Sequence, residues 1–313
     1  MSLEAVRAAA TALEGIAVRT PLLEAPPLSR VAGVPVALKC EQLQPVGAFK
    51  LRGAYTALSR LPPAERARGV VSHSSGNHGQ AVAYAARLLG IPAVIVMPET
   101  APRVKIEGVR RYGAEIVFVG PRAAERQAKA AELAETRGLV PIPPYESLDV
   151  IAGQGTCGLE IVEQWPEVTT LVVPVGGGGL LAGITTAVRA LKPAARIVGV
   201  EPTGAPKLSA ALAAGKPVPA DGGGSIADGL LPLSVGFLPF AHFAGRVEAV
   251  QVSDDEIVAA VRFLARDMDL RVEPSGAVTT AAILAGRLTL SGPTALVVSG
   301  GNVDPEHFQR LVG

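Results

Sequence analysis

Short apolar segments alternate with amphipathic segments along most of the chain. In the part before Pro141, the predicted strands are residues 69–73, 91–97 and 114–119, and the predicted helices are residues 77–89, 101–112 and 122–137. Strands that alternate with helices are joined by crossover connections, which are almost always right-handed and make the strands parallel. This part of the chain therefore predicts one parallel sheet with helices packed on it.

A second series begins after Pro141, Pro143 and Pro144. Its predicted strands are residues 170–175, 196–201, 247–252 and 295–299, and its predicted helices are residues 147–164, 180–191, 205–214, 254–267, 275–285 and 305–311. Before the first series we expect a helix over residues 2–15, a strand over residues 34–39 and a helix over residues 50–60. The pattern predicts an α/β fold with two lobes, each an open, mainly parallel sheet with helices on both faces. We assign residues 1–66 and 147–313 to a discontinuous large domain and residues 67–146 to a small domain.

The composition limits the partners of this protein. Its 313 residues suffice for about two domains. The 29 basic and 28 acidic side chains nearly cancel, so the chain has no field that would attract nucleic acid. Charged residues make up only 18% of the chain, which favours buried parallel strands and an apolar subunit interface. We therefore expect no nucleic-acid partner and a homo-oligomer, either a dimer or a tetramer.

The sequence shows no membrane or secretion signal. Residues 1–7 lack the apolar core of a signal peptide, and the apolar run over residues 171–184 contains four glycines and is too short to span a bilayer. Cys40 and Cys157 have no paired spacing, which argues against a disulfide framework or a zinc site. We expect a cytoplasmic protein with no membrane partner. Because the chain ends directly after its last predicted helix, we also expect no effector domain, and hence hyperbolic kinetics.

Lys50 is the first candidate for chemistry. It follows a small-residue turn and Phe49, and it opens an apolar helix in the stretch Gly-Ala-Phe-Lys-Leu-Arg-Gly-Ala that begins at Gly47. Burial at such a position lowers the pKa of a lysine, and a partly neutral amine can hold an aldehyde cofactor as a Schiff base. The alternative is an ordinary lysine whose stem packs over Leu51 while its ammonium reaches water. The other motifs of the chain decide between the two.

The glycine run Gly176–Gly179 stands between a predicted buried strand and a predicted helix. Backbone N–H groups at such a turn can converge on an anion at the helix N-terminus, which suits a phosphate. On this turn alone a dinucleotide site would be favoured, because Gly177, Gly179 and Ala182 have the spacing of a nucleotide-binding fingerprint and Glu201 ends the next strand. A nucleotide site, however, explains neither Lys50 nor two further polar turns, at residues 74–80 and 298–302.

Together these four segments resemble those of the fold type II (tryptophan synthase beta-like) pyridoxal-phosphate-dependent enzymes, in the branch of threonine/serine dehydratases and serine racemases. The resemblance spans nearly the whole chain. It extends to Glu-Gln-Leu-Gln-Pro at residues 41–45, Ile-Ala-Gly-Gln-Gly-Thr at 151–156, Gly-Val-Glu-Pro at 199–202, Ile-Ala-Asp-Gly at 226–229 and Glu-Pro-Ser-Gly-Ala at 273–277.

The resemblance implies a pyridoxal 5'-phosphate site. Lys50 would hold the cofactor, Phe49 would pack against the pyridine ring and Asn77 would bond the phenolic oxygen. The glycines at 176, 177, 178 and 179 would take the phosphate, and Ser299 would face the pyridine nitrogen. A neutral hydroxyl there does not force that nitrogen to stay protonated, which favours elimination over transamination. The alternatives are purely structural roles: a core aromatic for Phe49, a helix N-cap for Asn77 and a strand end for Ser299.

The resemblance also implies an amino-acid substrate. Ser74, Ser75 and His78 would hold its carboxylate, and Arg126, Tyr145 and Ser234 would face its side chain. We expect a threonine dehydratase, in which Lys50 removes the α proton of L-threonine or L-serine, the β-hydroxyl leaves, and a 2-oxo acid and ammonia are released. The alternatives are a 3-hydroxyaspartate dehydratase, a serine racemase in which Ser75 is the acid on the opposite face, and a nicotinamide-dependent oxidoreductase from another class.

One position departs from the pattern that the resemblance implies. Racemase relatives bind a divalent or monovalent cation through a glutamate, a carbonyl four residues later and an acid six residues later. Glu201 and Ala205 match the first two positions, but Lys207 stands at the third. A cation at Glu201 is therefore expected only if water fills the missing ligand position, and the alternative is that the Lys207 ammonium replaces the ion.

Overall fold

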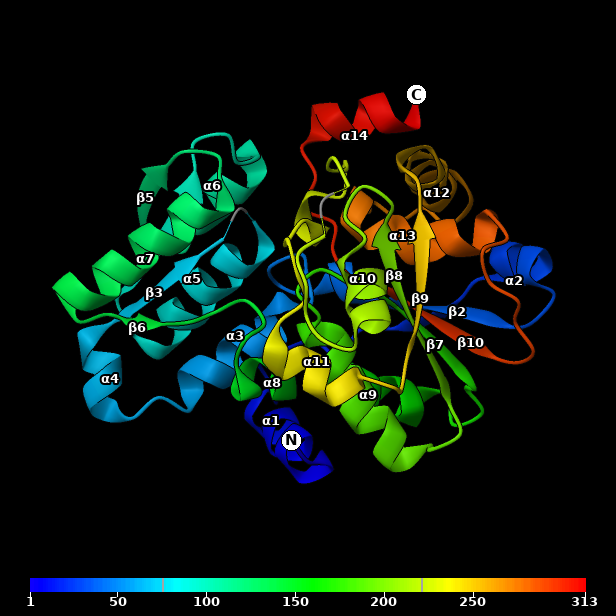
Figure 1. Cartoon of the computed structure of the whole chain (residues 1–313), viewed down its shortest axis with the longest axis horizontal. Coiled ribbons are helices and arrows are strands. Elements are labelled where there is room, and N and C mark those ends of the chain that lie inside the picture. The colour runs from blue at the N-terminus through cyan, green and yellow to red at the C-terminus, as the bar shows by residue number, and fades with distance from the viewer. Residues whose placement is uncertain (75, 221) are drawn as a thin grey trace.

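Two separate sheets organise the protein. The computed structural model describes residues 1–74, 76–220 and 222–313. The larger sheet has the strand order β1-β2-β10-β7-β8-β9, and the smaller one has the order β5-β4-β3-β6 (Figure 1). Only β1 runs antiparallel to its neighbour. The strands of the larger sheet are β1 (Leu22–Glu24), β2 (Val36–Cys40), β7 (Thr170–Pro174), β8 (Arg196–Pro202), β9 (Glu248–Val252) and β10 (Thr294–Val298).

The smaller sheet is covered on both faces. Its strands are β3 (Val70–His73), β4 (Ala93–Pro98), β5 (Glu115–Val119) and β6 (Val140–Pro141), and its helices are α5 (Asn77–Leu89), α6 (Arg103–Arg111) and α7 (Ala123–Arg137). Successive side chains of a strand point to opposite faces. Accordingly, Val70 and Ile95 pack against α5, whereas Val71 and Val94 pack against α7.

The larger sheet also has helices on both faces. One face packs against α2 (Pro26–Ala32), α12 (Asp254–Asp267), α13 (Pro274–Leu284) and α14 (Pro305–Val312). The other packs against α8 (Leu148–Gln164), α9 (Gly179–Leu191), α10 (Lys207–Ala214) and α11 (Phe237–Phe243), and α1 (Leu3–Ala12) lies on α8 and α9. The remaining elements are α3 (Lys50–Ser59), α4 (Pro63–Arg68) and the short 3-10 helices η1 (Glu41–Leu43) and η2 (Asp228–Leu230).

Helix α3 connects the two units, because it packs against α5 on one side and α8 on the other. Two glycines of α8 and α9 allow these helices to approach closely. A Cβ atom at Gly153 would lie 2.3 Å from the Arg52 carbonyl oxygen of α3, and one at Gly183 would lie 2.4 Å from the Ile151 carbonyl oxygen of α8. The N-terminus of α3, where Lys50 stands, is therefore fixed by tight backbone packing.

The predicted α/β fold with mainly parallel sheets is confirmed. Helix α5 begins and ends at the predicted residues, and most other elements differ by one to three residues at an end. The prediction missed β1, α2, α4, β6 and α11. The division into residues 67–146 and the rest of the chain is our proposal; the four strands of the smaller sheet all lie within it. In the described ranges, no helix combines the length and the apolar character that a membrane crossing needs.

Candidate active site

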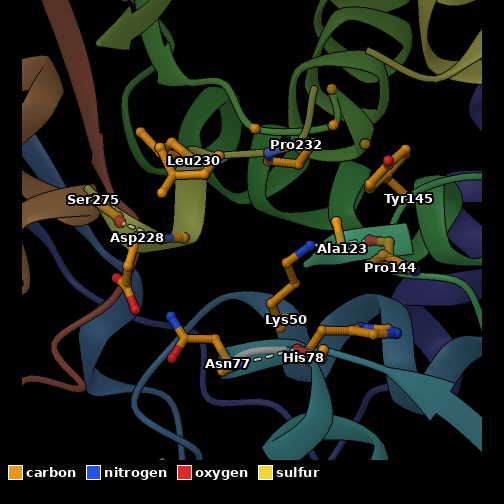
Figure 2. A pocket seen from close by; sticks show the side chains of 18 of the residues that line it. Lys50, Asn77, His78, Ala123, Pro144, Tyr145, Asp228, Leu230, Pro232 and Ser275 are labelled. Carbon is orange, nitrogen blue, oxygen red and sulfur yellow. Dashed lines mark hydrogen bonds between the residues drawn. The ribbon is translucent and has the colours of Figure 1, made fainter. Parts of the chain in front are cut away.

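A cavity of about 410 Å³ lies between the two sheets, beside the carboxyl ends of β3, β7 and β10 (Figure 2). In open α/β sheets this edge is where ligands bind. The cavity collects most of the predicted site residues: Phe49, Lys50, Ser74, Asn77, His78, Arg126, Tyr145, Gly176, Gly177, Gly178, Gly179, Ser234 and Ser299. Glu201 does not line it. Ser75 lies outside the described residues.

Lys50 is the first residue of α3, and Figure 2 shows its side chain extending into the middle of the cavity. Its Nζ donates a hydrogen bond to the Pro144 carbonyl oxygen at 3.0 Å and lies 5.1 Å from the centre of the Phe49 ring. Burial lowers the pKa of Lys50 to about 8. In the described part of the chain no carboxylate forms an ion pair with it. The interpretation as an ordinary solvated lysine therefore does not fit, and a useful fraction of the amine is neutral near physiological pH.

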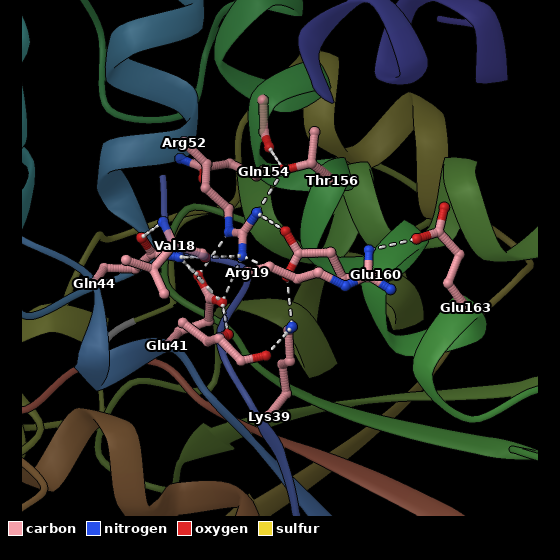
Figure 3. Close-up of polar contacts among 12 residues, drawn as sticks. Val18, Arg19, Lys39, Glu41, Gln44, Arg52, Gln154, Thr156, Glu160 and Glu163 are labelled. Carbon is pink, nitrogen blue, oxygen red and sulfur yellow. Dashed lines mark hydrogen bonds and ion pairs between the residues drawn. The ribbon is translucent and has the colours of Figure 1, made fainter. Parts of the chain in front are cut away.

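The start of α3 is held by a buried group of charges, which we call the Arg52 cluster (Figure 3). The Arg52 guanidinium donates to both carboxylate oxygens of Glu41, at 2.7 and 2.8 Å, and to both of Glu160, at 2.6 and 2.8 Å. Lys39 donates to Glu160 as well, at 2.5 Å. Because Arg52 is two residues after Lys50, the cluster fixes the helical turn from which the lysine projects.

The glycine turn joins β7 to α9. Gly178 is the N-cap of α9 and has a φ of 90°, which favours glycine. A Cβ atom at Gly177 would lie only 2.1 Å from the Tyr145 ring. The Tyr145 ring thus packs closely on the turn and leaves no room for a side chain at Gly177. Backbone N–H groups at the start of a helix suit a phosphate. On this observation, and on the low pKa of Lys50, the cavity fits a phosphorylated aldehyde.

Asn77 and Ser299 both line the cavity. Asn77 is not the N-cap of α5, because Gly76 takes that position, so the N-cap alternative is wrong. Its Nδ2 donates to Glu273 and its Oδ1 accepts a hydrogen bond from Asn302 at 2.9 Å. Ser299 directly follows β10 and is buried; its Oγ donates to the Ser275 carbonyl oxygen at 3.5 Å.

His78 carries no charge at any physiological pH. Burial, together with the charge of the nearby Lys50, lowers its pKa to about 3. Its Nε2 lies 3.1 Å from the Ile142 carbonyl oxygen, and this nitrogen therefore carries the proton of the neutral ring. Among the described residues Nδ1 has no hydrogen-bond partner.

Arg126 and Tyr145 also line the cavity. The Arg126 guanidinium donates to the Pro121 carbonyl oxygen at 2.8 Å and forms no ion pair in the described part of the chain. Burial lowers the pKa of Arg126 and raises that of Tyr145. On the small-domain side, the Ser74 Oγ accepts a hydrogen bond from the Gly76 backbone N–H at 3.1 Å.

Sequence reasoning missed six polar residues that line the cavity: His73, Lys105, Gln127, Asp228, Glu273 and Ser275. The Lys105 Nζ lies 2.6 Å from Asp228 Oδ2 and 3.1 Å from Glu273 Oε2, and the Ser275 Oγ accepts from the Gly229 N–H at 2.9 Å. Asp228, Glu273 and Ser275 belong to segments that carried the family resemblance, where no role was assigned to them. For Lys105 the available signal was its position one turn before Val109, on the buried side of α6.

Glu201 lies apart from the cavity, at the end of β8. Its carboxylate accepts hydrogen bonds from the Leu208 N–H at 2.6 Å and the Ser209 N–H at 2.8 Å, at the start of α10. The Lys207 Nζ lies 3.8 Å from Glu201 Oε2 and donates to the Ala205 carbonyl oxygen at 2.8 Å. No cluster of three His, Cys, Asp or Glu suited to a metal occurs in the ranges that the structure describes. The cation at Glu201 stays a prediction.

Comparison with known proteins accounts for this arrangement. The family model described as pyridoxal-phosphate-dependent enzyme matches residues 13–300. The chain belongs to this family. Its cofactor is therefore pyridoxal phosphate, and the nicotinamide alternative is not supported. The chain is 40% identical to the L-threonine ammonia-lyase of Thermotoga maritima, over 100% of this chain and 78% of that protein.

Two further relatives have other names. The chain is 41% identical to the L-threo-3-hydroxyaspartate ammonia-lyase of a Pseudomonas species, over 97% of this chain and 96% of that protein. The solved structure of maize serine racemase superimposes with a TM-score of 0.94 at 37% identity, covering 99% of this chain and 96% of that one. The comparisons thus show a PLP-dependent enzyme with ammonia-lyase relatives, and they leave the substrate open.

Proposed function

We propose that this member of the PLP-dependent family is an L-threonine ammonia-lyase that also accepts L-serine. The observation that carries the proposal is Lys50, a lysine with a pKa of about 8 whose amine lies in the cavity and forms no ion pair with a carboxylate of the described residues. Such an amine can take a proton from carbon near neutral pH. The Ser299 hydroxyl at the end of β10 supports elimination over transamination, and the name of the Thermotoga maritima relative supports threonine.

In this proposal the residues of the chain divide the work. The glycine turn would hold the cofactor phosphate, Asn77 and Ser299 would contact the ring, and Ser74 and His78 would hold the substrate carboxylate. When bound, the cofactor supplies an electron sink for the α carbon of an amino acid. The Lys50 Nζ takes the α proton, and the bond between the β carbon and its hydroxyl breaks with release of water. The enamine product is then hydrolysed by water to the 2-oxo acid and ammonia.

A second candidate is an ammonia-lyase for L-threo-3-hydroxyaspartate. Arg126 favours it, because this guanidinium lines the cavity and forms no ion pair in the described ranges. A second carboxylate on the substrate would supply the missing charge. The name of the Pseudomonas relative, at 41% identity, points the same way. A serine racemase is a third candidate, which the name of the maize relative supports. Its expected acid, Ser75, lies outside the described residues.

The test combines a spectrum with a substrate panel. We expect the purified protein to be yellow, borohydride to fix the cofactor to the chain, and peptide mapping to find the adduct on Lys50. L-threonine, L-serine and L-threo-3-hydroxyaspartate are then compared by 2-oxo acid release, with chiral analysis of the remaining serine. L-threonine should have the highest kcat/KM. A higher value for hydroxyaspartate that falls by about tenfold or more in Arg126→Met would favour the second candidate. Rapid formation of D-serine would favour a racemase.

The location and the assembly state also stay predictions. We propose a cytoplasmic homo-oligomer. Light scattering of the purified holoenzyme would measure the number of subunits.

A further inference from the structure

Helix α6 of the smaller sheet reaches across to the larger unit through polar contacts. The Val104 N–H donates to the Asp304 carboxylate at 3.0 Å, just before α14. The next residue, Lys105, places its ammonium 2.6 Å from Asp228 in η2 and 3.1 Å from Glu273 at the N-cap of α13. In Figure 1, α6 and α14 lie toward the top of the view, and α3 and α8 lie below them. The Lys105 contacts therefore join the two units at the side of the cavity away from α3.

Lys105 is a buried charge with two buried or half-buried partners. Only 2% of its side chain and 1% of the Glu273 side chain are exposed, which makes a missing partner costly. Burial alone would lower the pKa of Lys105, but the charges of Glu273 and Asp228 outweigh it and hold that pKa above its ordinary value. Burial raises the pKa of Glu273, and the Lys105 charge opposes the rise. Loss of Lys105 would thus favour the protonated form of Glu273.

The ionised Glu273 in turn orients Asn77. One of its carboxylate oxygens, Oε2, faces Lys105, and the other, Oε1, accepts a hydrogen bond from Asn77 Nδ2. Asn302 Nδ2 donates to Asn77 Oδ1 at 2.9 Å, so both ends of the amide are fixed. An amide nitrogen has two protons, and Glu273 takes one. The second is left for a partner in the cavity.

The ion pairs of Lys105 also lie between two cavities. Lys105, Asp228 and Glu273 line the main cavity and also a second cavity of about 140 Å³, which Asp304 and His307 line on its far side. The ion pairs of Lys105 therefore separate the main cavity from a second opening beside α14. Without them the two cavities would join, and water would enter the site from this side.

We propose that Lys105 is a positioning residue of the active site: it holds α6 on η2 and α13, closes the cavity beside α14, and keeps Glu273 ionised so that Asn77 presents its amide to the cofactor. This inference depends on the cofactor site of the family and not on the substrate proposed above. It concerns a residue that acts through Glu273 and Asn77 and takes no part in proton transfer itself.

The test uses the holoenzyme of the parent and of Lys105→Met, Lys105→Arg and Arg103→Met. Arg103 is the matched control, because it stands on the same helix but forms an exposed pair with Glu107. In Lys105→Met we expect faster amide hydrogen exchange over α6 and η2, a changed pH dependence of the cofactor absorbance, and a fall in kcat/KM of about tenfold or more. Lys105→Arg should restore part of each effect, and Arg103→Met should stay within about twofold of the parent.

Asp228→Asn distinguishes the effect on the contact between the two units from the effect on Glu273. It also replaces Lys105→Met in the test if that variant does not fold. It removes one partner across the units but leaves Lys105 beside Glu273, so α6 should exchange faster while the absorbance keeps the parent's pH dependence. Unchanged exchange in both variants, or a Lys105→Met enzyme with parental absorbance and kcat/KM, would overturn the inference. Exchange and absorbance need no substrate. A parent that turns over no β-hydroxy amino acid would therefore refute the proposed function without affecting these two measurements.

Discussion

Lys50 and Lys207 are two lysines with the same perturbation and different surroundings: Lys50 is half-buried, and Lys207 is fully buried. Burial lowers the pKa of each to about 8. The Lys50 amine lies in a 410 Å³ cavity, and its hydrogen bond goes to a backbone carbonyl. The Lys207 ammonium is fully buried outside that cavity, between the Ala205 carbonyl and the Glu201 carboxylate. A low pKa is therefore common to both sites, and access to a ligand belongs to Lys50 alone.

The Arg52 cluster shows a third outcome of burial. Burial lowers the pKa of Arg52 too, but the charges of Glu41 and Glu160 outweigh it and hold that pKa above its ordinary value. The three sites teach that burial perturbs a charge and that its partners decide the result. Arg52, with two carboxylate partners, has a raised pKa and keeps its proton. Lys207, whose carboxylate partner is 3.8 Å away, has a lowered pKa. Lys50, which lies in a cavity and has no carboxylate partner in the described residues, has a lowered pKa and is free to react.

The largest effect is expected from removing the reactive lysine. Lys50→Ala should lower kcat by about a thousandfold or more, because both the anchor of the cofactor and the base are lost. Borohydride should no longer attach the cofactor to the chain. Lys207→Met is the matched comparison, and it should keep the colour and most of the turnover. An equal loss of turnover in the two variants would mean that the low pKa of Lys50 does not indicate a catalytic role.

A smaller effect, on stability, is expected at the Arg52 cluster. Arg52→Met leaves Glu41 buried without its main partner and should reduce the free energy of unfolding by about 3–5 kcal/mol. Arg196 offers a control, since it also forms a two-bond pair with a glutamate, Glu248, but a partly exposed one. Arg196→Met should cost about 0–1 kcal/mol. Urea unfolding of both variants measures the difference, and similar values would mean that burial does not strengthen the Arg52 pairs.

Much of this fold could be predicted because its signals are local. Buried parallel strands are short apolar runs, such as residues 170–174, and Lys50 and the glycine turn are each recognisable within a few residues. The elements that were missed have weak local signals. The strand β1 has only three residues, and α11, α2 and α4 are short helices with prolines in or near their first turn.

The contacts of Lys105 could not be predicted for another reason. Its partners Asp228 and Glu273 are 123 and 168 residues away in the chain. Nothing local indicates that α6 meets η2 and the start of α13, because this contact results from the packing of the two units. Glu201 differs, because its partners at the start of α10 are only six to eight residues away and Lys207 was already the expected alternative to a cation there. For Lys105, the sequence predicted the helix that carries it but not its long-range partners.

The smallest effect is expected at Lys207, and it depends on pH. The pKa of Lys207 is about 8 in the folded protein and 10.5 for an ordinary lysine. Below pH 8 the Lys207 amine is protonated in both the folded and the unfolded state, so the folded state bears the full free-energy cost of burying an ammonium. Between these two values the unfolded state holds more protons, so the stability of the parent rises with pH. Lys207→Met lacks this contribution.

Lys207→Met should be more stable than the parent at low pH, and this difference in the free energy of unfolding should shrink by about 3 kcal/mol as the pH rises through this window. The variant should still fold, because backbone N–H groups at the start of α10 satisfy Glu201 without the lysine. Urea unfolding at several pH values measures the shrinkage, and Lys216→Met, at an exposed lysine just after the same helix, is the control. A difference between Lys207→Met and the parent that does not change with pH would mean that the Glu201 charge fully compensates the burial of Lys207. In that case Lys207, like Arg52, would keep its proton because of its carboxylate partner. Of the three groups, only Lys50 would then have a lowered pKa.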